Sequence, residues 1–201
     1  MIKGLTALSL AVVIATGSTA LHAQSTQATD EDTSEATQLE DQLSFGEEGP
    51  QIGQTYTAEV IGDWELQCIK TETDEDPCQM YQLMADTENQ PIAEFSLFRL
   101  PEGGRAVAGA TLVVPLESSL PQQVSIAIDG QAARRYPYAF CNTVGCYARI
   151  GLTAEDVAAY RAGNSATITI VPALAPDQQV QLELSLTGFT KTYEKVSIAD
   201  Q

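Results

Sequence analysis

The chain has 201 residues, and its 27 aspartates and glutamates against 10 lysines and arginines give a formal net charge of −17 at pH 7. So few cations exclude non-specific nucleic-acid binding, because such binding depends on lysine and arginine contacts to phosphate. The same deficit disfavours direct adsorption to an anionic membrane surface. We expect the acidity to keep the protein dispersed in solution. The alternative is that the negative charge serves to bind a cationic partner or divalent ions.

The N-terminus has the pattern of a bacterial export signal. Lys3 supplies a positive charge, residues 5–14 are apolar apart from two hydroxyl side chains, and Leu21-His22-Ala23 forms a cleavage motif before Gln24. The apolar run of about 10 residues is too short to span a bilayer, and no later segment predicts a transmembrane helix. We therefore expect a signal peptide over residues 1–23, and a mature protein that is periplasmic, associated with the outer membrane or secreted.

Cleavage of that signal would remove His22, the only histidine in the chain. The mature protein would then lack Ser-His and Cys-His nucleophiles, histidine zinc ligands and a histidine general base. We therefore expect no catalysis and no cofactor. A carboxylate-based hydrolase is the weaker alternative, because paired carboxylates cleave glycosides, but the acidic residues are too numerous for one pair to stand out.

The following stretch, residues 24–54, differs in composition from the rest of the chain. It contains eight acidic residues, no lysine or arginine, and only four large apolar side chains. Such a segment cannot bury enough apolar surface to offset the entropy lost on ordering. We expect an acidic, disordered tether that ends in the turn-forming residues around Pro50, followed by one domain over residues 55–201.

Alternation of apolar and polar residues predicts β-strands through most of that domain. It is clear in Trp64, Leu66 and Cys68, and Asp129-Gly130 predicts a tight hairpin turn. The predicted strands, in chain order, cover residues 55–62, 63–70, 78–84, 92–100, 106–114, 124–129, 134–140, 145–150, 165–171 and 180–186, with a last edge strand at 190–198.

One short helix is predicted among these strands, over residues 154–161. Thr153 is the expected N-cap, Glu155 and Asp156 occupy the first turn, and Gly163 follows the C-terminal end. Short strands with turn signals between them and one connecting helix indicate an all-β fold, an antiparallel β-sandwich.

Four cysteines form two close pairs along the sequence, Cys68 with Cys78 and Cys141 with Cys146. Three disulfide connectivities are possible, and the sequence alone does not choose among them. Each pair flanks a strand-turn-strand pattern, and an oxidising compartment favours disulfides, so we expect two local bridges. A four-thiolate zinc site is disfavoured, because the spacing does not match that of structural zinc sites.

The segments around the cysteines resemble the invasion-associated locus B (IalB) family. The resemblance rests on Gly62-Asp-Trp-Glu-Leu-Gln-Cys68, on Cys78-Gln-Met-Tyr81, and on Phe140-Cys-Asn-Thr-Val-Gly-Cys-Tyr-Ala-Arg149 followed by a helix and the strand 166–170. Members are exported bacterial proteins, and the resemblance implies an immunoglobulin-like β-sandwich. The founding member is associated with entry into host cells. The family has no established catalytic residues, so the resemblance assigns none to this chain.

The function we expect is that of an extracytoplasmic binding or interaction module in the bacterial envelope, with an envelope or cell-surface protein as partner. Loops on a rigid scaffold commonly carry such specificity, and arginine and tyrosine are enriched at interface hot spots. The competing interpretation is that these tyrosines pack on the sheet and the arginines pair with carboxylates. The predicted partner-binding residues are Arg134, Arg135, Tyr136, Tyr138, Tyr147 and Arg149.

Weak calcium binding is the alternative function. The loop between Cys68 and Cys78 contains four closely spaced carboxylates, and oxygen ligands suit a hard cation. The loop lacks the glycine and the terminal glutamate of an EF-hand, and most runs of charge are simply solvated. The predicted calcium ligands are Glu72, Asp74, Glu75 and Asp76.

Overall fold

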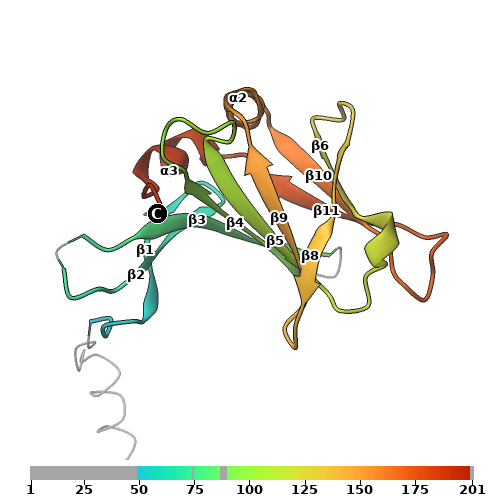
Figure 1. Ribbon diagram of the computed structural model, residues 1–201, viewed down its shortest axis with the longest axis horizontal. Helices are drawn as coiled ribbons and strands as arrows, with labels where there is room; N and C mark the ends of the chain where they lie inside the picture. The colour runs from blue at the N-terminus through green and yellow to red at the C-terminus, as the bar shows by residue number, and fades with distance from the viewer. Residues whose placement is uncertain (1–48, 74, 87–89, 200–201) are drawn as a thin grey trace, which may run out of the picture. The chain divides into compact units, whose positions relative to one another are not determined.

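The computed structural model describes residues 49–73, 75–86 and 90–199. The predicted signal peptide and most of the predicted acidic tether lie outside the described residues. Within them, the chain forms two antiparallel β-sheets, two α-helices and one short 3-10 helix, Leu120–Gln122 (Figure 1). No helix in this described part is long and apolar enough to cross a membrane.

The larger sheet has seven strands in the order β1-β2-β3-β4-β5-β9-β8, and the smaller has four in the order β11-β10-β6-β7. Every strand pairs antiparallel with its neighbours. The strands of the larger sheet are β1 Thr55–Ile61, β2 Trp64–Ile69, β3 Cys78–Ala85, β4 Pro91–Arg99, β5 Ala108–Val114, β8 Tyr138–Cys141 and β9 Cys146–Leu152. Those of the smaller sheet are β6 Val124–Ile128, β7 Arg134–Tyr136, β10 Ser165–Ile170 and β11 Val180–Ser185.

The strand predicted over residues 134–140 is two strands in the structure. Pro137 separates β7 from β8, and the two strands lie at the edges of different sheets. Proline has no backbone N–H to donate to a ladder and holds φ near −65°, so it favours an interruption of pairing here. The chain therefore passes from the smaller to the larger sheet at Pro137.

The predicted helix is confirmed as α2, Ala154–Ala162. The Thr153 hydroxyl accepts a hydrogen bond from the backbone N–H of Asp156 (3.2 Å), and the Asp156 carboxylate accepts one from the Thr153 N–H (2.9 Å). This reciprocal pair is a capping box, and it satisfies two donors at the N-terminus of the helix.

The C-terminal edge strand predicted at 190–198 is wrong, because most of that segment forms a second helix, α3, Phe189–Lys195. The buried residues there are Phe189, Thr192, Tyr193 and Val196, which recur at i, i+3, i+4 and i+7. That spacing places them on one side of a helix, whereas a strand would separate them between two faces. Beyond the helix, an isolated bridge pairs Ile198 with Arg99 of β4, and Ser197 hydrogen-bonds Cys78 of β3.

The inward-facing side chains of both sheets and of both helices form one hydrophobic core. At one end of it, the fully buried Trp64 ring packs edge-to-face against Phe95 (6.1 Å between centroids) and Phe189 (5.6 Å). Tyr160 of α2 stacks on Phe189 at 5.5 Å. The two helices are therefore held on the sheets by a shared aromatic cluster.

Both predicted disulfides are confirmed, and each joins directly opposed residues of neighbouring strands. Cys68 of β2 faces Cys78 of β3, and Cys141 of β8 faces Cys146 of β9. The two cysteines of each bridge are separated by 10 and 5 positions in the sequence, respectively. They therefore fix the strand register at two hairpins of the larger sheet.

Candidate interaction surfaces

The six predicted partner-binding residues do not form one continuous surface. Their strands belong to two different sheets. The structure distributes the six over three strands: Arg134, Arg135 and Tyr136 on β7, Tyr138 on β8, and Tyr147 and Arg149 on β9.

Two of these residues, Tyr136 and Tyr138, are part of the packed structure. Both are half-buried and pack against the hydrophobic core. Burial raises the pKa of each hydroxyl above its ordinary value. For these two tyrosines the placement matches the interpretation that they pack on the sheet.

Tyr147 and Arg149 lie on the outer face of the larger sheet, beside Phe140 of β8. The rings of Phe140 and Tyr147 stack with centroids 4.6 Å apart and an interplanar angle of 12°. The Arg149 guanidinium lies 5.3 Å from the Phe140 ring centre, a cation–π contact. Phe140 is 42 % exposed although it is a large hydrophobic residue. We call Phe140, Tyr147 and Arg149 the aromatic ridge.

A β-bulge explains why Phe140 faces outward. Tyr138 pairs with the buried Ala148, whereas Phe140 pairs with the outward-facing Tyr147, so one extra residue lies between the two pairs. Strict alternation would place Tyr138 and Phe140 on the same face, and a bulge redirects the later side chain. Sequence reasoning missed Phe140 for this reason.

The hairpin that carries the ridge is closed tightly. The Cys141–Cys146 bridge spans it, and the Asn142 side-chain oxygen accepts hydrogen bonds from the backbone N–H groups of Val144 (2.8 Å) and Gly145 (3.2 Å). A Cβ on Gly145 would lie 2.5 Å from the carbonyl oxygen of Val114, so only glycine fits there. The hairpin projects beyond the neighbouring strands (Figure 1) and presents Val144, which is 69 % exposed.

The arginines of β7 line a separate hollow of about 520 Å³, which we call the arginine concavity. It lies between β7, the loop that joins β4 to β5, and the end of β9 with the start of α2. Arg105, from the loop between β4 and β5, also lines it, and sequence reasoning missed this residue because it lies far from β7 along the chain. The full lining is Arg105, Ala106, Arg134, Arg135, Tyr136, Gly151, Thr153 and Asp156.

Arg134 differs from the other two arginines because it has a carboxylate partner. Its guanidinium forms an ion pair with Oδ1 of Asp156, whose side chain is 8 % exposed. Oδ2 of Asp156 accepts from the backbone N–H and the hydroxyl of Thr153, both at 2.9 Å. Among residues 49–73, 75–86 and 90–199, the side chains of Arg105 and Arg135 have no ion pair or hydrogen bond.

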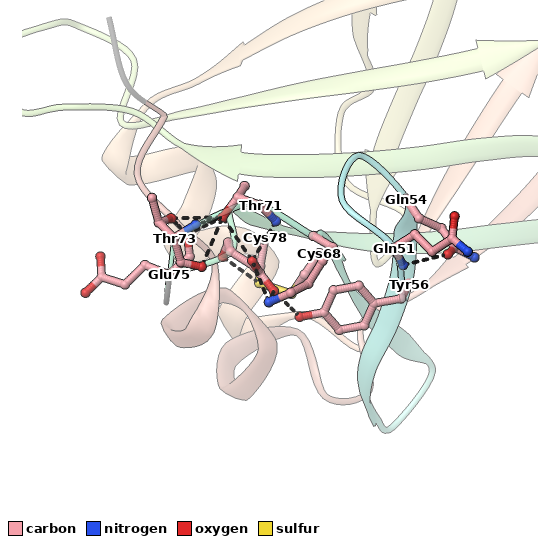
Figure 2. Close-up of polar contacts among 10 residues, drawn as sticks. Gln51, Gln54, Tyr56, Cys68, Thr71, Thr73, Glu75 and Cys78 are labelled. Atoms are coloured by element: carbon pink, nitrogen blue, oxygen red, sulfur yellow. Dashed lines mark hydrogen bonds and ion pairs between the residues drawn. A yellow bond between two sulfur atoms is a disulfide. The ribbon is translucent and has the colours of Figure 1, made fainter. Parts of the chain in front are cut away.

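In the acidic loop predicted to bind calcium, Asp76 has protein partners. Its carboxylate accepts hydrogen bonds from the Tyr56 hydroxyl (2.7 Å), the Thr71 backbone N–H (2.9 Å) and the Lys70 ammonium (3.1 Å). These donors, the Tyr56 hydroxyl above all, hold the pKa of Asp76 well below its usual range. Figure 2 shows Tyr56 directed at this loop beside the Cys68–Cys78 bridge.

The other predicted calcium ligands lie differently. Glu72 and Glu75 are exposed, and Figure 2 shows the Glu75 side chain directed away from the hydrogen-bonded cluster. Asp74 lies outside the described residues. Within the described part of the chain, no three histidine, cysteine, aspartate or glutamate side chains are grouped as metal ligands. Calcium binding at the complete loop stays a prediction.

Comparisons with known proteins match this fold and these disulfide-bearing segments. Residues 64–197 match the family model described as "Invasion associated locus B (IalB) protein". The chain is 26 % identical over 144 residues to invasion protein B homologs of two Brucella abortus strains, 2308 and biovar 1 strain 9-941, covering 72 % of this chain and 81 % of each relative.

A solved structure of an invasion-associated protein is also similar to this chain. The crystal structure of invasion associated protein B from Bartonella henselae aligns with a TM-score of 0.59 and 25 % identity, over 71 % of this chain and 93 % of that one. The family-model match contains both disulfides, both helices and strands of both sheets. The chain therefore belongs to the invasion-associated locus B family.

Proposed function

We propose that this protein is an exported, non-catalytic interaction module that binds an envelope or cell-surface protein through the aromatic ridge. The observation that carries the proposal is the exposed stack of Phe140 on Tyr147 with Arg149 over it. Aromatic residues and arginine are the types that most often supply binding energy at protein interfaces. The relatives named above are named for invasion, and those names state no enzymatic activity.

The rigidity of the ridge supports a binding role. Ordering mobile side chains at an interface costs free energy, and that cost weakens binding. Here the two rings already stack, and a disulfide and the Asn142 hydrogen bonds hold the hairpin beneath them. The apolar surface of the ridge therefore already has the conformation that a partner would bind, and the positive charge of Arg149 lies beside it.

The disulfides and the predicted signal support export. Disulfides persist in oxidising compartments and are rare in the cytosol of most bacteria. All four cysteines are in the two bridges. The compartment that we propose is the periplasm, the outer-membrane surface or the medium.

Affinity capture tests the proposal. The full-length protein, produced with its own signal and tagged at the C-terminus, would be recovered from cells after mild crosslinking, and its partners identified by mass spectrometry. We expect a double variant, Phe140→Ser with Arg149→Gln, to lose the captured partner. Leu83→Ser is the matched control, because Leu83 is 50 % exposed on β3 and lies outside the ridge. Equal capture by wild type and ridge variant would exclude this surface.

A further inference from the structure

We propose that the arginine concavity binds a small oxyanion, namely the phosphate or carboxylate group of a small ligand. Arg105 and Arg135 supply the contacts, and Arg134, which is paired with Asp156, lies beside them. This site extends the proposed interaction function by giving the module a second surface with a defined ligand chemistry. It does not require the aromatic ridge to bind anything.

Within its described residues, the protein does not neutralise the positive charges of Arg105 and Arg135. In a chain with 27 acidic residues and 10 lysines and arginines, basic side chains have many available partners. Lys70, Arg134, Arg161 and Lys195 each pair with a carboxylate. Among the described residues, the basic side chains without an ion pair are Arg99, Arg105, Arg135, Arg149 and Lys191, and of these Arg105 and Arg135 line the same hollow. Like charges held together repel one another, and a bound anion would relieve that repulsion.

The lining also lacks a free carboxylate. Among the described residues, Asp156 is the only acidic one in the lining, and both oxygens of its carboxylate are engaged, one by Arg134 and the other by the Thr153 cap. Three arginines against one aspartate leave two positive charges at the hollow. Guanidinium groups are permanently charged, and their planar fork matches the oxygens of a carboxylate or a phosphate.

Backbone hydrogen bonds fix the segments that bear these arginines. Arg134 and Arg135 lie on β7, which pairs with Ile126 and Ser125 of β6. The loop bearing Arg105 is tied to the end of β9, because the Val107 N–H donates to the Leu152 carbonyl at 2.8 Å. Elements far apart in the sequence are therefore held around one hollow, as binding sites require.

Part of the concavity's lining is formed by small residues. It contains Gly151 and Ala106, which have little or no side chain. A Cβ added to Gly151 would make only an ordinary contact with the Ala106 Cβ, at 3.5 Å. Packing therefore does not require glycine at this position, and a larger side chain there would enter the hollow.

Calorimetric titration of the purified full-length protein with inorganic phosphate, and separately with citrate, tests the site. Ionic strength is matched with sodium chloride throughout. We expect saturable binding to the wild type, and a loss of at least about tenfold in affinity in the Arg105→Gln/Arg135→Gln variant. The matched control, Lys191→Gln/Lys195→Gln, removes two exposed positive charges of α3 outside the concavity and the ridge, and we expect it to bind as the wild type does.

A steric variant separates the site from net charge. Gly151→Leu changes no charge, and we expect it to weaken anion binding while the melting temperature stays that of the wild type. Binding of phosphate alone or of citrate alone would support the site and show whether its ligand group is a phosphate or a carboxylate. Absence of saturable binding by both anions would overturn the proposal, as would equal loss in the charge control or full binding by Gly151→Leu. If the ridge variant loses its partner but still binds the anion, the anion site is supported independently of the ridge.

Discussion

The guanidinium of Arg149 lies 5.3 Å from the centre of the Phe140 ring, whose other neighbour in the ridge is Tyr147. The two residues come from neighbouring strands and meet because the bulge in β8 turns Phe140 to the outer face. A disulfide closes the same hairpin. This relationship joins an exposed aromatic ring, a cation and a rigid backbone at one place, which is why we assign binding to it.

Truncating Phe140 should leave the fold almost unchanged. Phe140 is 42 % exposed, whereas Phe95 is fully buried against Trp64. We expect Phe140→Ala to cost under about 1 kcal/mol, since little apolar area and one exposed cation–π contact are lost. Phe95→Ala should cost about 3–5 kcal/mol, because it leaves a cavity in the core. Urea denaturation compares the two, and equal losses would show that Phe140 is a core residue.

The two disulfides should differ in their effect on binding more than on stability. Removing either bridge by paired Cys→Ser substitution should lower the free energy of unfolding by about 2–3 kcal/mol in the chain-entropy model. Only loss of Cys141–Cys146 loosens the hairpin below the ridge. We expect that variant to capture less partner than the Cys68/Cys78 variant under conditions where both are folded. Equal capture by the two would contradict a role for hairpin rigidity.

Asp76 should make stability depend on acid pH. Its folded-state pKa is lowered by hydrogen bonds from Tyr56, Thr71 and Lys70, so the folded protein binds the proton less readily than the unfolded chain. Its stabilising contribution is therefore complete above the unfolded pKa of about 3.9 and is lost as the pH falls toward the lower folded value. Asp76→Asn should be less stable than wild type at pH 6, with a gap that narrows below about pH 4. A gap that is constant with pH, measured by urea denaturation, would contradict this.

The calcium prediction has its own measurement. A cation that binds the folded loop stabilises the protein by mass action, so the melting temperature should rise with roughly millimolar calcium and fall again with chelator. Glu72→Gln with Glu75→Gln should remove that rise, because both carboxylates are exposed and available. A melting temperature indifferent to calcium and chelator would end the hypothesis.

Local patterns in the sequence predicted most of the strands, the capped helix and the two bridges. Alternation at Trp64, Leu66 and Cys68 is enough to orient β2, and Thr153 with Asp156 is enough to begin α2. The strand predicted at the C-terminus is wrong because Phe189, Tyr193 and Val196 recur at helical spacing, which places all three on one side of α3.

The candidate sites were harder to predict because they depend on contacts between distant segments. No local pattern places Arg105 beside Arg135, or assigns the two sides of Pro137 to different sheets. For the aromatic ridge, however, the sequence contains a signal in the spacing of two cysteines. A Cys141–Cys146 bridge between adjacent strands fixes their register, and that register sets Phe140 against Tyr147.

Site-specific photo-crosslinking in intact cells tests the central claim most directly. A photoreactive amino acid would replace Val144 at the tip of the ridge hairpin, or Leu174 between β10 and β11, where the side chain is 86 % exposed. Our account predicts a discrete adduct with one envelope or cell-surface protein from position 144 and none from position 174. No adduct at 144, or the same adducts from both positions, would contradict it.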